Sequence, residues 1–167
     1  MKKTGIFYGS TTGTTEDIAG RIANRLGIPA TDVHSAGELS EESIAAYECL
    51  LIGTSTWGDG ELQDDWYDAA SVLEKSDISD KIIALFGCGD SSCYSDTFCD
   101  AMGLLYEKIK GRCTVKGQTS VEGYSFSSSK AVDGDSFVGL VIDEMNESDK
   151  TDARIDSWTS KLMEELE

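Results

Sequence analysis

Three short apolar segments, each followed by a polar loop containing glycine, constrain the fold of this chain more than any other feature. Each loop leads into a segment with helical spacing of apolar residues. The segments and the helices that follow them occupy residues 4–8 and 14–26, 49–54 and 64–73, and 81–86 and 96–109. This alternation predicts an α/β fold with a doubly wound parallel sheet and helices on both faces. In such a sheet, loops at the carboxyl ends of neighbouring strands converge on one crevice.

The remaining segments complete one predicted domain over residues 1–167, with no linker that would divide it. We expect Thr14 to cap the first helix with Asp17 as its reciprocal partner, and Ser40 to cap a weak helix. The other predicted elements are a strand at 30–34, a strand starting at 113–116 and resuming at 140–142, and a closing helix at 151–166. The glycine- and serine-rich stretch 117–139 is therefore expected to be a lobe inserted within the last strand.

The charge balance restricts the kind of partner that this chain can have. With 14 basic and 31 acidic residues, the formal net charge is -17. Such a surface repels nucleic acid and anionic membranes, and it favours transient encounters with basic patches of redox proteins, unless the acidity serves solubility alone. The five cysteines form no CxxC motif, so neither a zinc ribbon nor a reactive dithiol is predicted. We expect reduced thiols, no metal, no signal peptide and a monomer in the cytoplasm.

The first loop is typical of a binding site for a phosphate monoester. It comprises Ser10, Thr11, Thr12, Gly13, Thr14 and Thr15, directly before a helix. Unpaired N–H groups and the helix dipole favour an anion there, and Gly13 allows close approach. The loop lacks the lysine of nucleotide hydrolases, so neutral donors would bind a terminal phosphate. A plain Ser/Thr-rich turn is the alternative.

The second and third loops each contain one aromatic ring that lies outside any apolar periodic pattern. Trp57 occurs in the loop 54–61, and Tyr94 occurs in the loop 87–94. Two rings at adjacent strand ends predict a flat ligand stacked between them, with about 1–3 kcal/mol for each stack by analogy with nucleobases. Asp90 could accept a hydrogen bond from a ring imide, or it could cap its own turn. Satellite core residues are the alternative for both rings.

A phosphate tail and a flat ring together describe flavin mononucleotide (FMN). The peptide between Gly58 and Asp59 can rotate so that its carbonyl accepts a hydrogen bond from the central ring nitrogen, which is protonated on reduction, because glycine tolerates positive φ. An ordinary glycine turn is the alternative. Carboxylates crowd the loops: Asp59, Glu61, Asp64, Asp65, Asp90, Asp96 and Asp100. Each would disfavour an anionic reduced flavin by roughly tens of millivolts at most, which predicts a low potential.

The three loops together resemble those of the flavodoxin family. The first resembles the family signature T/S-x-T-G-x-T, the second continues through Gly60 to Trp66 as in the family, and Gly87 to Ala101 resembles the third. The inserted lobe resembles that of the long-chain subclass. The resemblance implies strand order 2-1-3-4-5 with FMN at the switch point. Several positions depart from common usage, namely Gly58, Asp59, Ser91, Cys93, Thr97 and Cys99.

The resemblance implies a single-electron carrier that shuttles non-covalently bound FMN between semiquinone and hydroquinone, without a substrate of its own. Its cofactor-binding residues would be Ser10, Thr11, Thr12, Gly13, Thr14, Thr15, Thr54, Ser55, Thr56, Trp57, Gly58, Asp59, Gly60, Cys88, Gly89, Asp90, Tyr94 and Asp96. No catalytic residue is expected.

Three other functions fit the same fold. An FMN-dependent NAD(P)H or quinone oxidoreductase would oxidise NAD(P)H without a partner. A phosphorylated receiver needs an acidic pair after the first strand, where this chain has Tyr8, Gly9 and Ser10. A low-molecular-weight phosphatase needs a cysteine and an arginine in the first loop, and neither is present.

Overall fold

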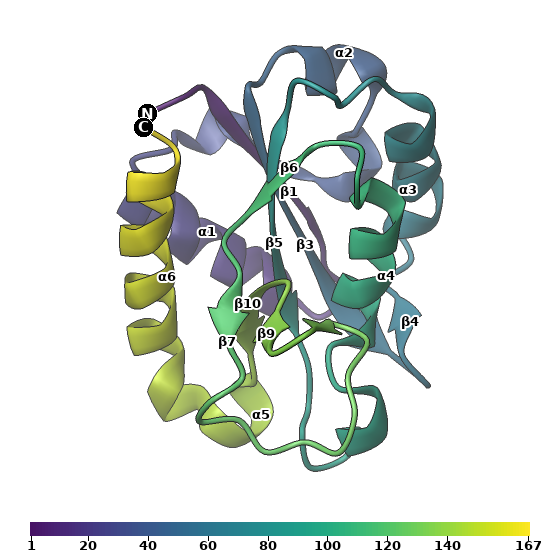
Figure 1. The fold of residues 1–167 in the computed structure, drawn as a ribbon, viewed down its shortest axis with the longest axis vertical. Coiled ribbons are helices and arrows are strands. Elements are labelled where there is room, and N and C mark those ends of the chain that lie inside the picture. Colours follow the sequence, from purple (N-terminus) through teal and green to yellow (C-terminus); the bar gives the residue numbers. More distant parts are fainter.

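A computed structural model describes residues 1–167 and contains one central parallel sheet (Figure 1). The main strands are β1 (Thr4–Gly9), β2 (Val33–Ser35), β3 (Cys49–Trp57), β5 (Ile82–Cys88) and β10 (Gly139–Ile142). They lie in the order β10-β5-β3-β1-β2, and every neighbouring pair is parallel. In chain order this is the predicted 2-1-3-4-5 topology, because the short β4 (Glu61–Leu62) pairs antiparallel with β3 outside that order.

Two short strands together form one edge of the sheet. β6 (Thr114–Lys116) pairs with the first half of β5, from Ile82 to Ala84. β10 pairs with the second half, from Leu85 to Cys88. The intervening segment forms a small antiparallel sheet of β7 (Thr119–Ser120), β9 (Ser136–Phe137) and β8 (Val132–Asp133). The edge strand is thus divided in two, with the lobe residues between its halves.

Aromatic side chains attach the lobe to the rest of the molecule. Phe98, which precedes α4 (Asp100–Ile109), stacks on Phe126 with ring centroids 5.4 Å apart. Tyr124 meets Phe137 edge to face at 5.0 Å, and its hydroxyl donates to the carbonyl of Val141 in β10. The lobe therefore shares the apolar core on the α4 side of the sheet.

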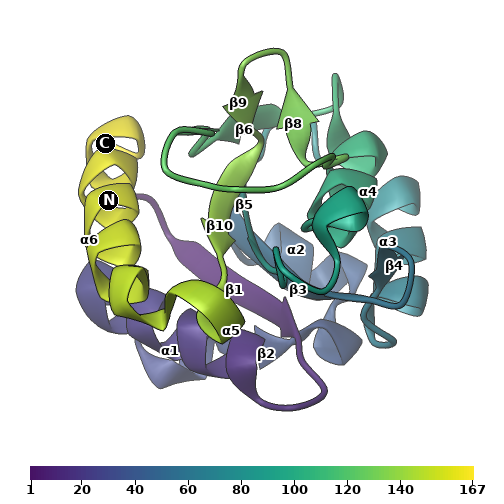
Figure 2. The ribbon, with the colours of Figure 1, turned by 90° about the horizontal axis from the view of Figure 1, so that it is seen from below.

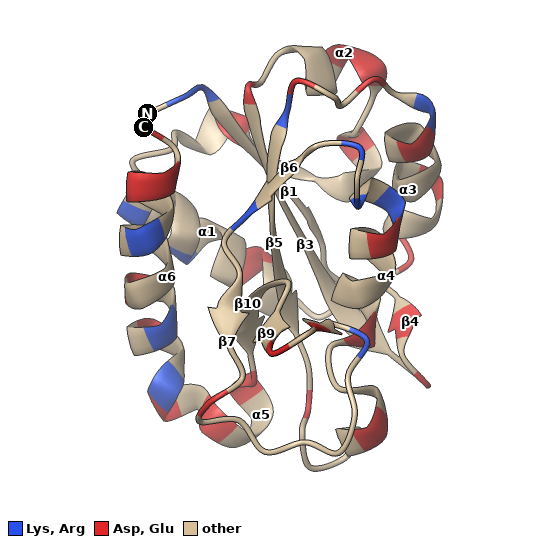
Figure 3. Ribbon diagram, in the orientation of Figure 1, with Lys and Arg blue, Asp and Glu red and all other residues tan.

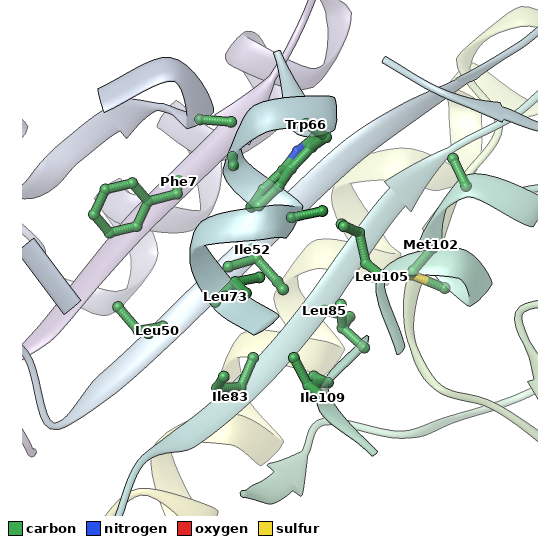
Figure 4. Close-up of a cluster of buried hydrophobic side chains, with 14 of the residues drawn as sticks. Phe7, Leu50, Ile52, Trp66, Leu73, Ile83, Leu85, Met102, Leu105 and Ile109 are labelled. Carbon is green, nitrogen blue, oxygen red and sulfur yellow. The ribbon is translucent and has the colours of Figure 1, made fainter. Parts of the chain in front are cut away.

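Helices cover both faces of the sheet, as the alternating pattern predicts. Figure 2 shows α1 (Thr14–Leu26) and α6 (Thr151–Glu165) on one side, and α3 (Trp66–Lys75) and α4 on the other. Side chains of β3 alternate between the two cores: Leu50 and Ile52 face α3 and α4, whereas Leu51 faces α1 and α6. Figure 4 shows the first of these cores. Burial on both faces explains why β3 and β5 are continuously apolar in sequence.

Some predicted boundaries are wrong for local backbone reasons. Residues Ala30–Asp32 form a 3-10 turn, so β2 begins only at Val33. The helix predicted over 96–109 begins at Asp100, because Cys99 has a left-handed φ of 54° after the 3-10 turn Ser95–Thr97. Ser40 caps α2 (Glu41–Ala45) as predicted, with its hydroxyl accepting from the N–H of Ser43.

Candidate functional site

The ends of β3 and β5 and the loop after β1 border one cavity of about 200 Å³. The carboxyl ends of these strands lie at the end of the molecule opposite the two termini (Figure 1). Each of the three loops contributes to its wall, and so does the short helix α5 (Glu144–Glu147) after β10. The lining residues are Thr12, Thr14, Ser55, Thr56, Trp57, Gly58, Cys88, Gly89, Asp90, Tyr94, Thr97, Cys99, Glu144 and Met145.

Ten of the predicted cofactor-binding residues line this cavity, all of them in the three loops or at the strand ends. Eight others lie outside its wall: Ser10, Thr11, Gly13, Thr15, Thr54, Asp59, Gly60 and Asp96. Most of these eight belong to the first loop, or to the turn after Trp57, so they adjoin the lining residues in the chain. Thr54 is different, because it is buried and its hydroxyl donates to the carbonyl of Ser55 at 2.8 Å.

The first loop leads into α1 with free hydrogen-bond donors. The residue at the N-cap is Gly13, with φ 96°, and no side chain caps the helix, so the expected capping box of Thr14 and Asp17 is wrong. Gly13 has no side chain that could accept hydrogen bonds from the first-turn N–H groups of α1. The first bond within the helix is from Asp17 N–H to the Gly13 carbonyl at 3.0 Å. The N–H groups of residues 14–16 therefore remain available to an anion.

Thr15 is an orphaned polar group at the same helix end. Its side chain is fully buried, and its hydroxyl has no hydrogen-bond partner. A buried hydroxyl without a partner is destabilising, and at this helix end a bound anion would satisfy it. Two hydroxyls of the loop accept hydrogen bonds from the protein: Ser10 from the N–H of Gly13 at 3.1 Å, and Thr11 from the side-chain amide of Gln63 at 3.1 Å. The loop thus has the donors that a phosphate requires and no cationic side chain.

Trp57 occupies the last position of β3 and is 40% exposed. The sequence predicted a loop here, but β3 continues because it pairs with β4, with Trp57 opposite Glu61. The indole N–H donates to the Ser55 hydroxyl at 2.8 Å, which fixes the ring at the cavity wall. The turn that joins the two strands contains Gly58 at φ 50° and Gly60 at φ 94°. Both values favour glycine over any other residue.

The third loop is braced by its own polar groups. Asp90 Oδ1 accepts from the N–H groups of Ser92 and Cys93 and from the side-chain amide of Asn146. The N–H of Cys93 and the amide of Asn146 hold the pKa of Asp90 below its usual value. Asp90 therefore caps its own turn with one oxygen, and it also lines the cavity. Tyr94, 50% exposed, follows directly on this braced turn.

A buried carboxylate after β10 anchors the third loop. Asp143 has no exposed surface, and it accepts from the backbone and hydroxyl of Ser91 and from the backbone and amide of Asn146. It also places Glu144 and Met145 at the cavity, which the sequence analysis missed. The one feature of the sequence that could have indicated them is their position directly after the last strand, because the loop after a parallel strand lies at the same end of the sheet as the other three loops. Met145 is 77% exposed, more than any other large apolar side chain of this protein.

Thiols at the cavity are poor nucleophiles. Burial raises the pKa of Cys88 to about 12, and it raises the pKa of Cys99 well above its usual value. Cys93 is exposed but does not line the cavity. No group of three or more His, Cys, Asp or Glu side chains is arranged to hold a metal ion. These residues favour a packing role for the thiols around a ligand over covalent chemistry.

A larger cavity, of about 610 Å³, lies elsewhere, between the lobe and α6. Its cationic side chains are already engaged: Arg154 stacks on Tyr124 and binds Glu147, and Lys161 binds the carbonyl of Gln118. None of the three strand-end loops reaches it. Size alone therefore does not identify the site, because donors and exposed rings gather at the smaller cavity.

The surface around the site is acidic. Figure 3 shows acidic residues at β4, at α5 and in the segment before α4, near the carboxyl ends of the strands. Asp100, behind the turn of Gly60, is buried, and desolvation raises its pKa.

None of the helices has the length and apolar character needed to cross a bilayer.

Comparison with known proteins agrees with this geometry. The Flavodoxin family model matches residues 6–158. Flavodoxin 1 of Escherichia coli K12 is 45% identical over 99% of this chain and 96% of its own length, and the Haemophilus influenzae flavodoxin is 42% identical. The crystal structure of Fusobacterium nucleatum flavodoxin bound to FMN superposes with a TM-score of 0.89 at 30% identity, covering 99% of both chains. By sequence and by structure, the chain belongs to the flavodoxin family.

Proposed function

We propose that this protein is an electron carrier that binds FMN non-covalently and has no substrate of its own. The observation that carries the proposal is that Thr12, in the first loop, and Thr14, the first residue of α1, border the same cavity as Trp57 and Tyr94. One end of the cavity offers hydrogen-bond donors and the other offers aromatic surface. This pairing suits a flat ring with a phosphate tail, and the FMN-bound relative supports it.

The residues present fit the cofactor. The first-turn N–H groups of α1 and the orphaned hydroxyl of Thr15 would hold the phosphate, without a positive side chain. Trp57 and Tyr94 would hold the ring and shield it from water, each contributing about 1–3 kcal/mol by analogy with base stacking. When bound, FMN supplies the capacity to accept and release electrons one at a time.

Two features of the chain would tune the potential. The carbonyl of Gly58 would accept a hydrogen bond from the protonated central ring nitrogen after the Gly58–Asp59 peptide rotates, and the positive φ of Gly58 supports this role. Carboxylates such as Asp59 and Glu61 would disfavour extra negative charge on the ring. Together they favour a low potential.

The partners proposed are redox proteins with basic patches, bound transiently by this monomer. The net charge of -17 and the acidic rim of the cavity support charge-steered encounters. A cytoplasmic location accords with five free cysteines. We also infer one domain over 1–167, with 117–139 as the inserted lobe of a long-chain flavodoxin, supported by the lobe's position between β6 and β10.

Reductive titration of the FMN-loaded protein, followed by its visible spectrum, tests the proposal. We expect bound FMN and two separate one-electron steps. Absence of FMN binding would refute the proposal. The competing hypothesis, an NAD(P)H or quinone oxidoreductase, is less consistent with the flavodoxin relatives. Rapid NADPH oxidation by the isolated protein would favour that enzyme.

A further inference from the structure

Gln63 links two of the three loops, although it is buried and does not line the cavity. It lies between β4 and α3 and is only 3% exposed. Its side-chain amide donates to the hydroxyl oxygen of Thr11 in the first loop at 3.1 Å. Its backbone N–H donates to the hydroxyl of Thr54, near the end of β3, at 3.4 Å. One side chain therefore crosses from the second loop to the first.

The orientation of the Gln63 amide is fixed by its neighbour Asp65. The N–H of Asp65 can only donate, and it donates to Gln63 Oε1 at 2.9 Å. Gln63 Nε2 must then face the other way, where it donates both to Asp65 Oδ2 at 3.2 Å and to Thr11. A side chain on Gly9 would collide with Gln63 Oε1 and with the Trp66 ring, so glycine at the end of β1 makes room for this amide.

This orientation determines what the Thr11 hydroxyl can do. A hydroxyl has one proton to donate and two lone pairs that accept. Since Gln63 Nε2 donates to one lone pair, the proton of Thr11 must point away from Gln63. Thr11 is exposed, so its hydroxyl is left as a donor towards the open side of the first loop. Phosphate oxygens only accept hydrogen bonds, so a donor is what they need.

We infer that Gln63 is a positioning residue for the phosphate: through Thr11 it raises selectivity for FMN over the same flavin without phosphate. This inference rests on the proposed function. It assigns a phosphate role to a residue of the second loop, the loop that otherwise serves the ring.

The test is a double-mutant cycle with two ligands, FMN and riboflavin, measured as dissociation constants by quenching of flavin fluorescence. Gln63→Met keeps the length of the side chain but removes its hydrogen bonds, and Thr11→Val keeps the shape but removes the hydroxyl. We expect Gln63→Met to weaken FMN binding roughly tenfold and to leave riboflavin binding within about twofold. In the Thr11→Val background, Gln63→Met should have no further effect on FMN. Gln118→Met, an exposed glutamine of the lobe, is the matched control and should change neither constant.

The outcomes separate this inference from the proposed function. If the unmodified protein binds riboflavin as tightly as FMN, the phosphate site itself is refuted. If it prefers FMN but Gln63→Met weakens both ligands equally, Gln63 is merely structural and the inference is overturned. The same holds if Gln63→Met still weakens FMN binding without the Thr11 hydroxyl. Riboflavin binding also reports whether each variant is folded, and Gln63→Glu repeats the cycle should Gln63→Met bind neither ligand.

Discussion

The first and third loops meet the same cavity, but their polar groups are directed differently. In the first loop, the donors at the start of α1 and the hydroxyl of Thr15 have no partner within the protein. In the third loop, Asp90 and Ser91 are satisfied by the loop itself and by Asp143 and Asn146. One loop therefore offers hydrogen bonds to a ligand, whereas the other uses them to hold Tyr94 in place.

The difference indicates how the two ends of a flavin would be recognised. Hydrogen bonds left open at the first loop select a charged tail with defined geometry. Rigid aromatic surface at Trp57 and Tyr94 binds any flat ring, and it does so without donating to it. The phosphate end should therefore determine the selectivity for FMN over riboflavin. The ring end should contribute equally to the affinity for both ligands.

Removing the phosphate should have the largest effect. Riboflavin should bind at least about 100-fold more weakly than FMN, because two hydrogen bonds to a charged group already contribute about 3 kcal/mol. Calorimetric titration of the cofactor-free protein with both ligands measures the ratio. Equal affinities would contradict the contrast between the two loops.

Removing the anchor of the third loop should destabilise the protein itself. Asp143→Ala removes the buried acceptor shared by the Ser91 N–H and hydroxyl and by the Asn146 N–H, so we expect a loss of about 3 kcal/mol in unfolding free energy. Urea unfolding of the cofactor-free protein measures this loss. Asp135→Ala, at an exposed lobe position, is the control and should change little. If the urea midpoint of Asp143→Ala equals that of Asp135→Ala, the hydrogen bonds of Asp143 to the third loop do not contribute to stability.

Removing a ring should weaken both ligands alike. Trp57→Ala should cost about 1–3 kcal/mol of binding free energy for FMN and for riboflavin. Tyr67→Ala is the matched control, because Tyr67 is also an exposed aromatic but lies outside the cavity wall. The comparison between loops fails if Trp57→Ala weakens FMN but spares riboflavin.

The smallest effect is expected at Gly58. Gly58→Val disfavours the left-handed backbone there, at a cost of order 1 kcal/mol. If the Gly58 carbonyl accepts a hydrogen bond from the protonated ring nitrogen, the substitution should narrow the separation between the two one-electron midpoint potentials by roughly tens of millivolts. Spectroelectrochemical titration measures that separation, and an unchanged value would assign Gly58 to the turn alone.

The periodicity of the sequence predicted a parallel sheet whose loops meet at one edge, because loops at the carboxyl ends of neighbouring parallel strands converge. The order of the strands came from the resemblance to the flavodoxin family. The sequence did not predict the boundary of α4, since no propensity rule places a cysteine such as Cys99 at positive φ. The cap expected at Thr14 was wrong because Gly13 takes the N-cap position and leaves the first-turn donors open. At this helix end the usual preference for a side-chain cap is not followed, because a binding site needs free donors there.

Longer-range contacts at the site were harder to predict. Glu144 and Met145 reach the cavity only because Asp143 binds a loop that lies about fifty residues earlier. In the sequence, nothing distinguishes Gln63 from any other polar residue before a helix. Its hydrogen bond with Thr11 joins residues 52 positions apart. Such pairings depend on the assembled sheet and leave no periodic pattern in the sequence.

The division of the edge strand between β6 and β10 has a consequence for self-association. Uninterrupted edge strands expose a row of unpaired backbone groups, which can template pairing with a second chain. Here the two pieces span only Thr114–Lys116 and Gly139–Ile142, and Thr119 and Tyr124 of the lobe donate to the carbonyls of Gly139 and Val141. The short edge pieces thus leave little continuous edge for intermolecular β-sheet growth, and we expect this to protect the chain from aggregation independently of electron transfer.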